Sequence, residues 1–157
     1  MNVRKGTEND LQDVHNLVRE LATYENALEE VETTVESMRN DGFGGNPAFG
    51  FHVAEADGKI VGLSLYYYRY STWKGKLLYL EDLIVLESYR HKGIGRKLMD
   101  ATIEEAIAQQ CNGIQWQVLD WNQPAIRFYQ KYDPYIDAAW INCRLSRKQI
   151  EDHISSS

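Results

Sequence analysis

Residues 77–107 read LLYLEDLIVLESYRHKGIGRKLMDATIEEAI, and this stretch decides the fold. The first nine residues are apolar except for Glu81 and Asp82, which predicts a buried strand. Over 97–107 apolar residues recur at the spacing of one helical face, which predicts a helix. The strand enters the helix through a basic turn with two glycines. Because the first backbone N–H groups of a helix have no partner inside it, such a turn is a candidate site for an anion.

The turn itself has the sequence RHKGIGR at 90–96. Its two glycines would let a pyrophosphate approach the backbone, and its basic side chains would add positive charge to the helix dipole. An ordinary strand-to-helix turn with solvated bases is the alternative, and the local spacing does not decide between the two. The residues of the candidate site are Arg90, His91, Lys92, Gly93, Ile94, Gly95 and Arg96.

Two other phosphate-binding motifs fit this turn less well. A Walker loop needs Lys and then Ser or Thr directly after its second glycine, whereas Arg96 and Lys97 follow Gly95. A dinucleotide-binding fingerprint needs a third glycine in the region where Leu98 and Met99 stand. The sequence therefore disfavours a nucleotide-binding protein of either type.

The remaining pattern places helices first, then an antiparallel meander, then alternating strands and helices. Asp57-Gly58 predicts a hairpin turn, and Thr33 with Glu36 predicts the start of a second helix. The run of tyrosines at 66–70 is predicted to pack on the sheet rather than to bind a ligand. The order predicts an α/β (mixed α+β) fold with a twisted mixed sheet, flanked by helices, whose β-α-β unit is parallel. We expect one domain over 1–157, with helices near 11–21, 33–42, 96–113 and 123–132 and strands near 49–56, 59–70, 77–85, 114–119 and 140–145.

Composition argues against several classes of function. The chain has 17 Lys and Arg against 23 Asp and Glu, a net charge of −6, which argues against a nucleic-acid partner and weakly favours a cationic ligand. No apolar run reaches the ~20 residues of a membrane-spanning helix, and no secretory signal opens the chain. We therefore expect a cytoplasmic protein without a membrane partner. Cys111 and Cys143 lie far apart and the four histidines lack metal-ligand spacing, so we expect reduced thiols and no metal.

Two motifs together resemble a known family. Arg-x-x-Gly-x-Gly at 90–95 resembles the pyrophosphate-binding motif of GNAT acetyltransferases, and WNQPAIRFY at 121–129 is similar to the Asn-x-x-Ala-x-x-x-Tyr segment of that family. LATYE at 21–25, DGFG at 41–44 and GKLLYLED at 75–82 resemble the spermidine/spermine N-acetyltransferase group, which also contains thialysine acetyltransferases. The resemblance covers nearly the whole chain and implies a GNAT fold with acetyl-CoA as cofactor.

The resemblance also implies which residues bind acetyl-CoA. The basic turn would bind the pyrophosphate, and the backbone of Leu83, Ile84 and Val85 would bind the pantetheine arm and polarise the thioester carbonyl. The side chains of these three residues are predicted to lie in the core. Asn122 could equally be the N-cap of the helix that follows it. Further contacts with the cofactor are implied for Asn122, Pro124, Ala125 and Tyr129.

The catalytic residues that the resemblance implies are Tyr129 and Glu81. Tyr129 aligns with the tyrosine that is placed to protonate the departing thiolate, and a usual pKa of ~10 keeps its proton available. Neighbours on a regular strand point to opposite faces, so we expect only one of Glu81 and Asp82 to face the substrate, and the resemblance favours Glu81. Glu81 could hold an ammonium, or accept a proton directly or through a chain of waters; the alternative is a surface carboxylate. No cysteine lies in either motif, so we expect direct transfer in a ternary complex.

The acceptor implied by the resemblance is a small-molecule amine, bound by carboxylates and aromatic faces. Ser71-Thr72 replaces an acidic residue of the polyamine enzymes, which weakens the case for a long polyamine. A diamine or polyamine and a thialysine-like amino acid therefore stay open, beside another amino acid, a protein lysine and a non-catalytic acyl-CoA sensor. The resemblance also implies a homodimer. The residues implied in acceptor binding are Tyr24, Glu25, Trp73, Glu81 and Asp82.

Overall fold

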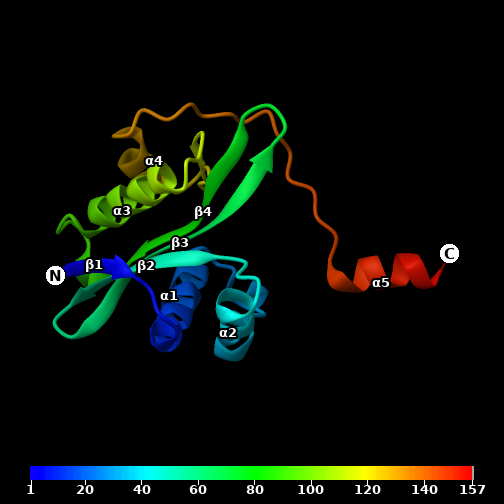
Figure 1. Ribbon diagram of the computed structural model, residues 1–157, viewed down its shortest axis with the longest axis horizontal. Coiled ribbons are helices and arrows are strands. Elements are labelled where there is room, and N and C mark those ends of the chain that lie inside the picture. Colours follow the sequence, from blue (N-terminus) through cyan, green and yellow to red (C-terminus); the bar gives the residue numbers. More distant parts are fainter. Residues whose placement is uncertain (157) are drawn as a thin grey trace. The chain divides into compact units, whose positions relative to one another are not determined.

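The computed structural model of the protein describes residues 1–156, which fall into two compact units, Met1–Gln117 and the residues from Val118 onward (Figure 1). The first unit consists of a five-stranded sheet and the helices that cover it. Its elements are β1 (Asn2–Lys5), α1 (Leu11–Tyr24), α2 (Val35–Phe43), β2 (Gly50–Ala56), β3 (Lys59–Ser71), β4 (Gly75–Val85), α3 (Ile94–Ala108) and β5 (Ile114–Gln115), with one-turn 3-10 helices at Glu8–Asp10, Leu28–Glu30 and Glu87–Tyr89.

The sheet has the strand order β1-β2-β3-β4-β5. Neighbouring strands are antiparallel except β4 and β5, which pair in parallel. In the sequence, α3 lies between these two strands. The predicted Asp57-Gly58 turn joins β2 to β3, with both residues at positive φ (53° and 72°). In Figure 1, α1 and α2 cover one face of the sheet and α3 covers the other. The predicted mixed α/β fold and its parallel β-α-β unit are confirmed.

Apolar side chains fill the layer on each face of the sheet. On the α1 face, the helical repeat predicted from the sequence buries Leu11 and Val14 completely, in one cluster with Leu63 of β3. On the α3 face, Ile94 and Leu98 are buried in a second cluster with residues of β2 and β3. Because Ile94 is the first residue of α3, this packing fixes the basic turn against the sheet.

The second unit contains α4 (Gln123–Gln130) and α5 (Arg147–Ser155). Asn122 caps α4, since its side-chain oxygen accepts a hydrogen bond of 3.3 Å from the Ala125 N–H, and Pro124 stands in the first turn as predicted. α5 begins at a capping box in which Ser146 and Gln149 bond each other's backbone N–H groups. No described helix of the chain is long and apolar enough to cross a lipid bilayer.

Several expected boundaries are wrong. The strand expected at 140–145 is absent: these residues have strand-like composition, but a strand forms only where its backbone pairs with a neighbour, and the structure gives this segment none. The strand expected at 114–119 is only two residues long, because pairing with β4 ends at Gln115. β1 and α5 were not predicted, since each carries too few apolar residues to produce a clear period.

Candidate active site

The basic turn has the backbone geometry of an anion site. Gly93 is the N-cap of α3 and has a φ of 79°, a left-handed conformation that glycine adopts without strain. His91 also has a positive φ, 61°, which is uncommon for a residue with a Cβ. These two reversals bring the chain from the end of β4 into α3. The first N–H groups of α3 have no partner within the helix and carry its positive dipole end.

The basic side chains of the turn differ in what they contact. Arg90 Nε donates a hydrogen bond of 3.0 Å to the Val85 carbonyl oxygen, and the Arg90 guanidinium lies 5.5 Å from the centre of the Tyr24 ring. Arg90 therefore ties the turn to the end of β4 and to the last residue of α1. The side chain of Arg96 is 80% exposed, and Lys92 is also exposed. The turn fits a diphosphate, because it offers backbone donors and exposed cations at the same place.

β4 contains a bulge at Glu81. Leu65 of β3 pairs with Asp82, whereas the next residue of β3, Tyr66, pairs with Leu80, so Glu81 has no partner on β3. A bulge inserts one residue into a strand and redirects the side chains on either side of it. The sequence shows no local sign of the bulge, because it arises from the register between two strands.

The bulge places both carboxylates on the face of the sheet that α1 covers. Leu65 belongs to the apolar cluster of that face, and paired residues share a face, so its partner Asp82 lies there. Tyr67, two residues beyond Leu65, pairs with Tyr79 on the same face, and Glu81 follows Tyr79 by two residues. The alternation expected from the sequence, in which only one of the two carboxylates faces this side, does not hold.

Two neighbouring carboxylates act on the carboxyl group of Asp82. The pKa of Asp82 rises from 3.8 to about 7, chiefly through burial and then through the negative charges of Glu81 and Glu25. Burial also raises the pKa of Glu25, which caps the C-terminus of α1. Glu81 itself is exposed. We call Glu25, Glu81 and Asp82 the acidic cluster; it would attract an ammonium, and Asp82 would exchange a proton near neutral pH.

Two tyrosines and an arginine lie beside the acidic cluster. The rings of Tyr67 and Tyr79 have centroids 5.1 Å apart, and the guanidinium carbon of Arg69 lies 5.7 Å from the Tyr79 centroid. Burial, and then the charge of Glu81, raise the pKa of both tyrosines, while the charge of Arg69 acts in the opposite direction. From the sequence, the tyrosine run was predicted to pack on the sheet, and Arg69 was not among the predicted site residues. The sequence does not show the pairing register between β3 and β4, which places these side chains on the same face as Glu81.

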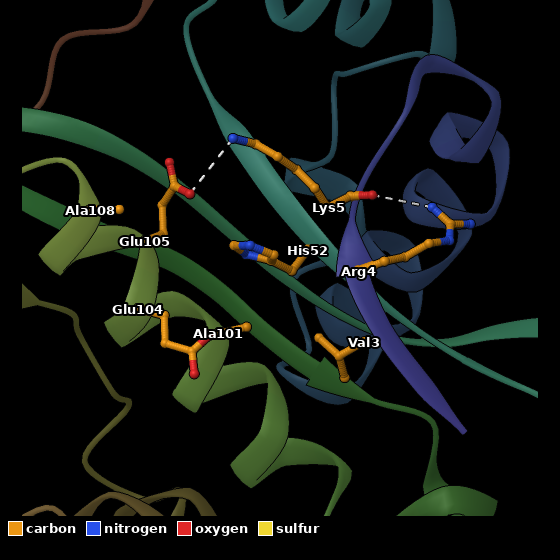
Figure 2. A pocket seen from close by; sticks show the side chains of 8 residues that line it. All are labelled: Val3, Arg4, Lys5, His52, Ala101, Glu104, Glu105 and Ala108. Carbon is orange, nitrogen blue, oxygen red and sulfur yellow. Dashed lines mark hydrogen bonds and ion pairs between the residues drawn. The ribbon is translucent and has the colours of Figure 1, made fainter.

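Sheet packing does describe the alternate tyrosines of the run. Tyr66 is 1% exposed, and the Tyr68 hydroxyl donates a hydrogen bond of 2.8 Å to Glu105 of α3. On this α3 face, a pocket of about 330 Å³ lies between β1, β2 and α3 (Figure 2). Burial lowers the pKa of His52, which lines it. The pocket is separate from the acidic cluster, since the two lie on opposite faces of the sheet. Its lining residues are Val3, Arg4, Lys5, His52, Ala101, Glu104, Glu105 and Ala108.

The backbone of the segment predicted to bind pantetheine lies at one edge of β4. Its side chains are core, as predicted: Ile84 is buried on the α1 face, and Leu83 and Val85 pack on the α3 face. β5 pairs with β4 only at Leu78 and Tyr79. The edge of β4 beyond Tyr79 is therefore not used by β5.

The other predicted site residues are placed as follows. Trp73 lies in the turn between β3 and β4 with 84% of its surface exposed, and its backbone N–H bonds the Ser71 hydroxyl. In the second unit, Tyr129 belongs to α4, where its ring centroid is 5.3 Å from that of Phe128. The roles of Asn122, Pro124, Ala125 and Tyr129 in cofactor binding stay predictions from the sequence.

Comparison with known proteins gives the same assignment at the level of family. The profile of the acetyltransferase (GNAT) family matches residues 11–133. Thialysine N-epsilon-acetyltransferase of Mus musculus is 40% identical over 136 residues, which cover 82% of this chain and 80% of that protein. The spermidine/spermine N(1)-acetyltransferase-like protein 1 of Homo sapiens is 35% identical over 96% of this chain, a match that covers 23% of the human protein.

Solved structures agree on the fold. An aminoglycoside acetyltransferase from an uncultured soil metagenomic sample superimposes with a TM-score of 0.76 and 22% identity, over 92% of this chain and 95% of that one. An aminoglycoside N-acetyltransferase in complex with CoA gives a TM-score of 0.68 at 18% identity, over 93% and 99%. With the family profile covering most of the sequence, the chain belongs to the GNAT family of acetyltransferases, which use acetyl-CoA.

Proposed function

We propose that the protein transfers the acetyl group of acetyl-CoA to a primary amine of a small cationic molecule. The observation that carries this proposal is the pair of adjacent carboxylates, Glu81 and Asp82, on one face of β4. β4 continues through a single helical turn into the basic turn. An amine held by the carboxylates and a diphosphate held by the turn would therefore lie toward the same end of β4.

This chain offers suitable groups for each part of acetyl-CoA, which supplies the acetyl thioester when bound. The N–H groups at the start of α3, with Lys92 and Arg96, would hold the diphosphate. The edge of β4 at 83–85 would offer backbone donors and acceptors to the pantetheine amides. A backbone N–H of that edge would also stabilise negative charge that develops on the carbonyl oxygen.

Asp82 is proposed as the proton acceptor and Glu81 as the group that holds the ammonium. A lysine-type ammonium has a pKa of ~10.4 and must lose a proton before its nitrogen can attack. An acceptor with a pKa of about 7 is ionised in part at neutral pH, yet binds a proton more strongly than an ordinary carboxylate. This proposal changes the expectation from the sequence, in which Glu81 was the candidate both for holding the ammonium and for accepting its proton, directly or through water.

Tyr129 is proposed as the proton donor to the departing sulfur. Its position in α4, seven residues after the Asn122 cap, matches the motif on which the resemblance rests. A phenol holds its proton at neutral pH and would release it only as the thiolate forms. A non-catalytic acyl-CoA sensor would not need such a donor, which favours an enzyme over a sensor.

The acceptor is proposed to be a diamine, a polyamine or a thialysine-like amino acid. Relatives that carry the names thialysine N-epsilon-acetyltransferase and spermidine/spermine acetyltransferase-like protein support this range. Another amino acid and a protein lysine are the alternatives. Glu25, together with Tyr24 and Trp73, would contribute to acceptor binding, since aromatic faces and carboxylates both attract ammonium groups.

We also propose that the protein is a cytoplasmic homodimer. Each chain is proposed to form a single acetyltransferase domain, which the match to one family profile across 11–133 supports. The dimer is the assembly that the resemblance to the spermidine/spermine N-acetyltransferase group implies.

The test is CoA release from acetyl-CoA against spermidine, spermine, putrescine, thialysine, lysine and a lysine-containing peptide. The proposal expects saturable turnover that prefers one small amine and falls at least about 100-fold in Asp82→Asn and in Tyr129→Phe. Asp13→Asn, an exposed carboxylate of α1, is the matched control and should leave turnover unchanged. Tight acetyl-CoA binding without turnover on any amine would favour the sensor instead.

A further inference from the structure

Arg69 places a positive charge beside the acidic cluster. Along β3, Leu65, Tyr67 and Arg69 alternate onto one face, and that face carries the carboxylates of Glu81 and Asp82. Arg69 is exposed. Among the residues of its own unit, Met1–Gln117, no carboxylate lies within ion-pair distance of its guanidinium.

Tyr79 lies between this cation and the acidic cluster. The guanidinium carbon of Arg69 lies 5.7 Å from the centroid of the Tyr79 ring, and Tyr67 packs against the same ring. A guanidinium stacked on an aromatic ring keeps its N–H donors at the edge of its plane. Within Met1–Gln117, no residue accepts a hydrogen bond from Arg69, so in this unit the edge is available to a ligand.

The spacing of the charges along this face favours a ligand that has a negative charge at one end and a positive charge at the other. Arg69 pairs with Leu77, and Glu81 follows Leu77 by four residues. Along β4, this spacing corresponds to about 13 Å between the Cα atoms of Leu77 and Glu81. Both side chains project from the same face, with tyrosine rings between them. A polyamine would bring ammonium groups to both ends and would be repelled at Arg69. A zwitterion with a carboxylate at one end and an amine at the other would match both charges.

We infer that Arg69 binds the carboxylate of an α-amino acid whose terminal side-chain amine is held by Glu81 and Asp82. This inference rests on the proposed function and narrows its acceptor class. Arginine suits the role because its planar fork can donate two parallel hydrogen bonds to one carboxylate. Within the open range of acceptors, it favours a lysine-like or ornithine-like amino acid over a diamine or polyamine.

The test compares substrate pairs that differ only in the carboxylate: L-lysine with cadaverine, and L-ornithine with putrescine. In the wild type, the amino acid of each pair should have the higher kcat/KM. In Arg69→Gln, kcat/KM for the amino acids should fall roughly 10- to 100-fold, mostly through KM, while the diamines keep or improve theirs. Arg69→Lys should recover part of the loss. Lys59→Gln, on the same strand, should leave kcat/KM unchanged for both the amino acids and the diamines.

Two further measurements keep the outcome clear. L-lysine methyl ester, assayed with the wild type alone, removes the carboxylate charge without any change to the protein and should behave like cadaverine. Calorimetry measures the affinity of the wild type and of Arg69→Gln for lysine and cadaverine, and so tests the role of Arg69 in binding without turnover. An equal preference for lysine over cadaverine in the wild type and Arg69→Gln, or a methyl ester as good as lysine, overturns the inference. Lysine binding that depends on Arg69 without turnover on any amine would overturn the proposed function instead and leave the carboxylate site standing.

Discussion

Replacing Asp82 by asparagine should make the protein more stable at pH 8 while it abolishes most of its activity. The pKa of Asp82 rises from 3.8 to about 7 on folding, because burial and the neighbouring carboxylates disfavour the charged form. Each pKa unit corresponds to ~1.36 kcal/mol, so ionising Asp82 costs the folded state about 4 kcal/mol. The asparagine of the variant is never charged and avoids this cost.

The sign and pH window of the effect follow from linkage. Below pH 3.8 the carboxyl is neutral in both the folded and the unfolded chain, and wild type and variant should have similar stability. Between pH 3.8 and about 7 the folded state retains a proton that the unfolded state has lost, so the free energy of unfolding of the wild type falls as the pH rises. Above pH 7 the difference between the two proteins should be constant, at up to about 4 kcal/mol.

Urea unfolding of both proteins at pH 4, 5, 6, 7 and 8 measures this difference directly. A parallel pH profile of kcat/KM in the wild type should show an ascending limb with an apparent pKa near 7, because the unprotonated carboxylate is the acceptor. Asp13→Asn, which removes an exposed carboxylate, should show no such pH-dependent gain. A stability difference that does not change between pH 4 and pH 8 would refute the reasoning, whatever its size.

Three further changes test the surroundings of the site. Gly93→Ala should lose about 1 kcal/mol of stability and weaken acetyl-CoA binding in calorimetry, because the residue has a φ of 79°; Gly45→Ala, in open space at ordinary φ, should do neither. Asp10→Asn should cost about 2 kcal/mol in urea unfolding at pH 7, since the paired Arg4 lowers the pKa of Asp10 from 3.8 to about 2; the loss should shrink as the pH falls from 4 to 2, where the wild-type carboxylate is itself protonated. Leu63→Ala should cost about 2–5 kcal/mol in thermal unfolding, because the side chain is completely buried, and a loss below about 1 kcal/mol would contradict the described core.

The parts of the fold that were predicted are those with a local cause. The strand and helix of 77–107 follow from apolar periodicity, and the Asp57-Gly58 hairpin follows from the residues that a tight turn requires. The basic turn was identified because its glycines and bases are contiguous in the sequence. β1 was missed, since a four-residue edge strand forms only because β2 offers it a partner.

The parts of the site that were missed depend on pairing between strands. Nothing near Glu81 indicates a bulge; it exists because Leu65 and Tyr66 of β3 pair with residues two apart on β4. Without the bulge, Glu81 and Asp82 were expected on opposite faces, and Glu81, the more exposed of the two, was favoured for the substrate side as an ammonium ligand or a proton acceptor. Arg69 was overlooked for the same reason, because its place beside the acidic cluster depends on which residues of β4 it pairs with, and no motif in the sequence records that pairing.

The bulge also explains how the chain tolerates two adjacent carboxylates in the middle of its sheet. In a regular strand, one of Glu81 and Asp82 would face α3, in the apolar layer that Leu98 and its neighbours fill, where an unpaired charge is costly. The bulge turns both toward the α1 face, so the cost of burial falls on Asp82 alone and appears as its raised pKa. The same distortion that spares the α3 layer therefore gives a GNAT acetyltransferase a carboxyl that titrates near neutral pH, on the strand that continues into its basic turn.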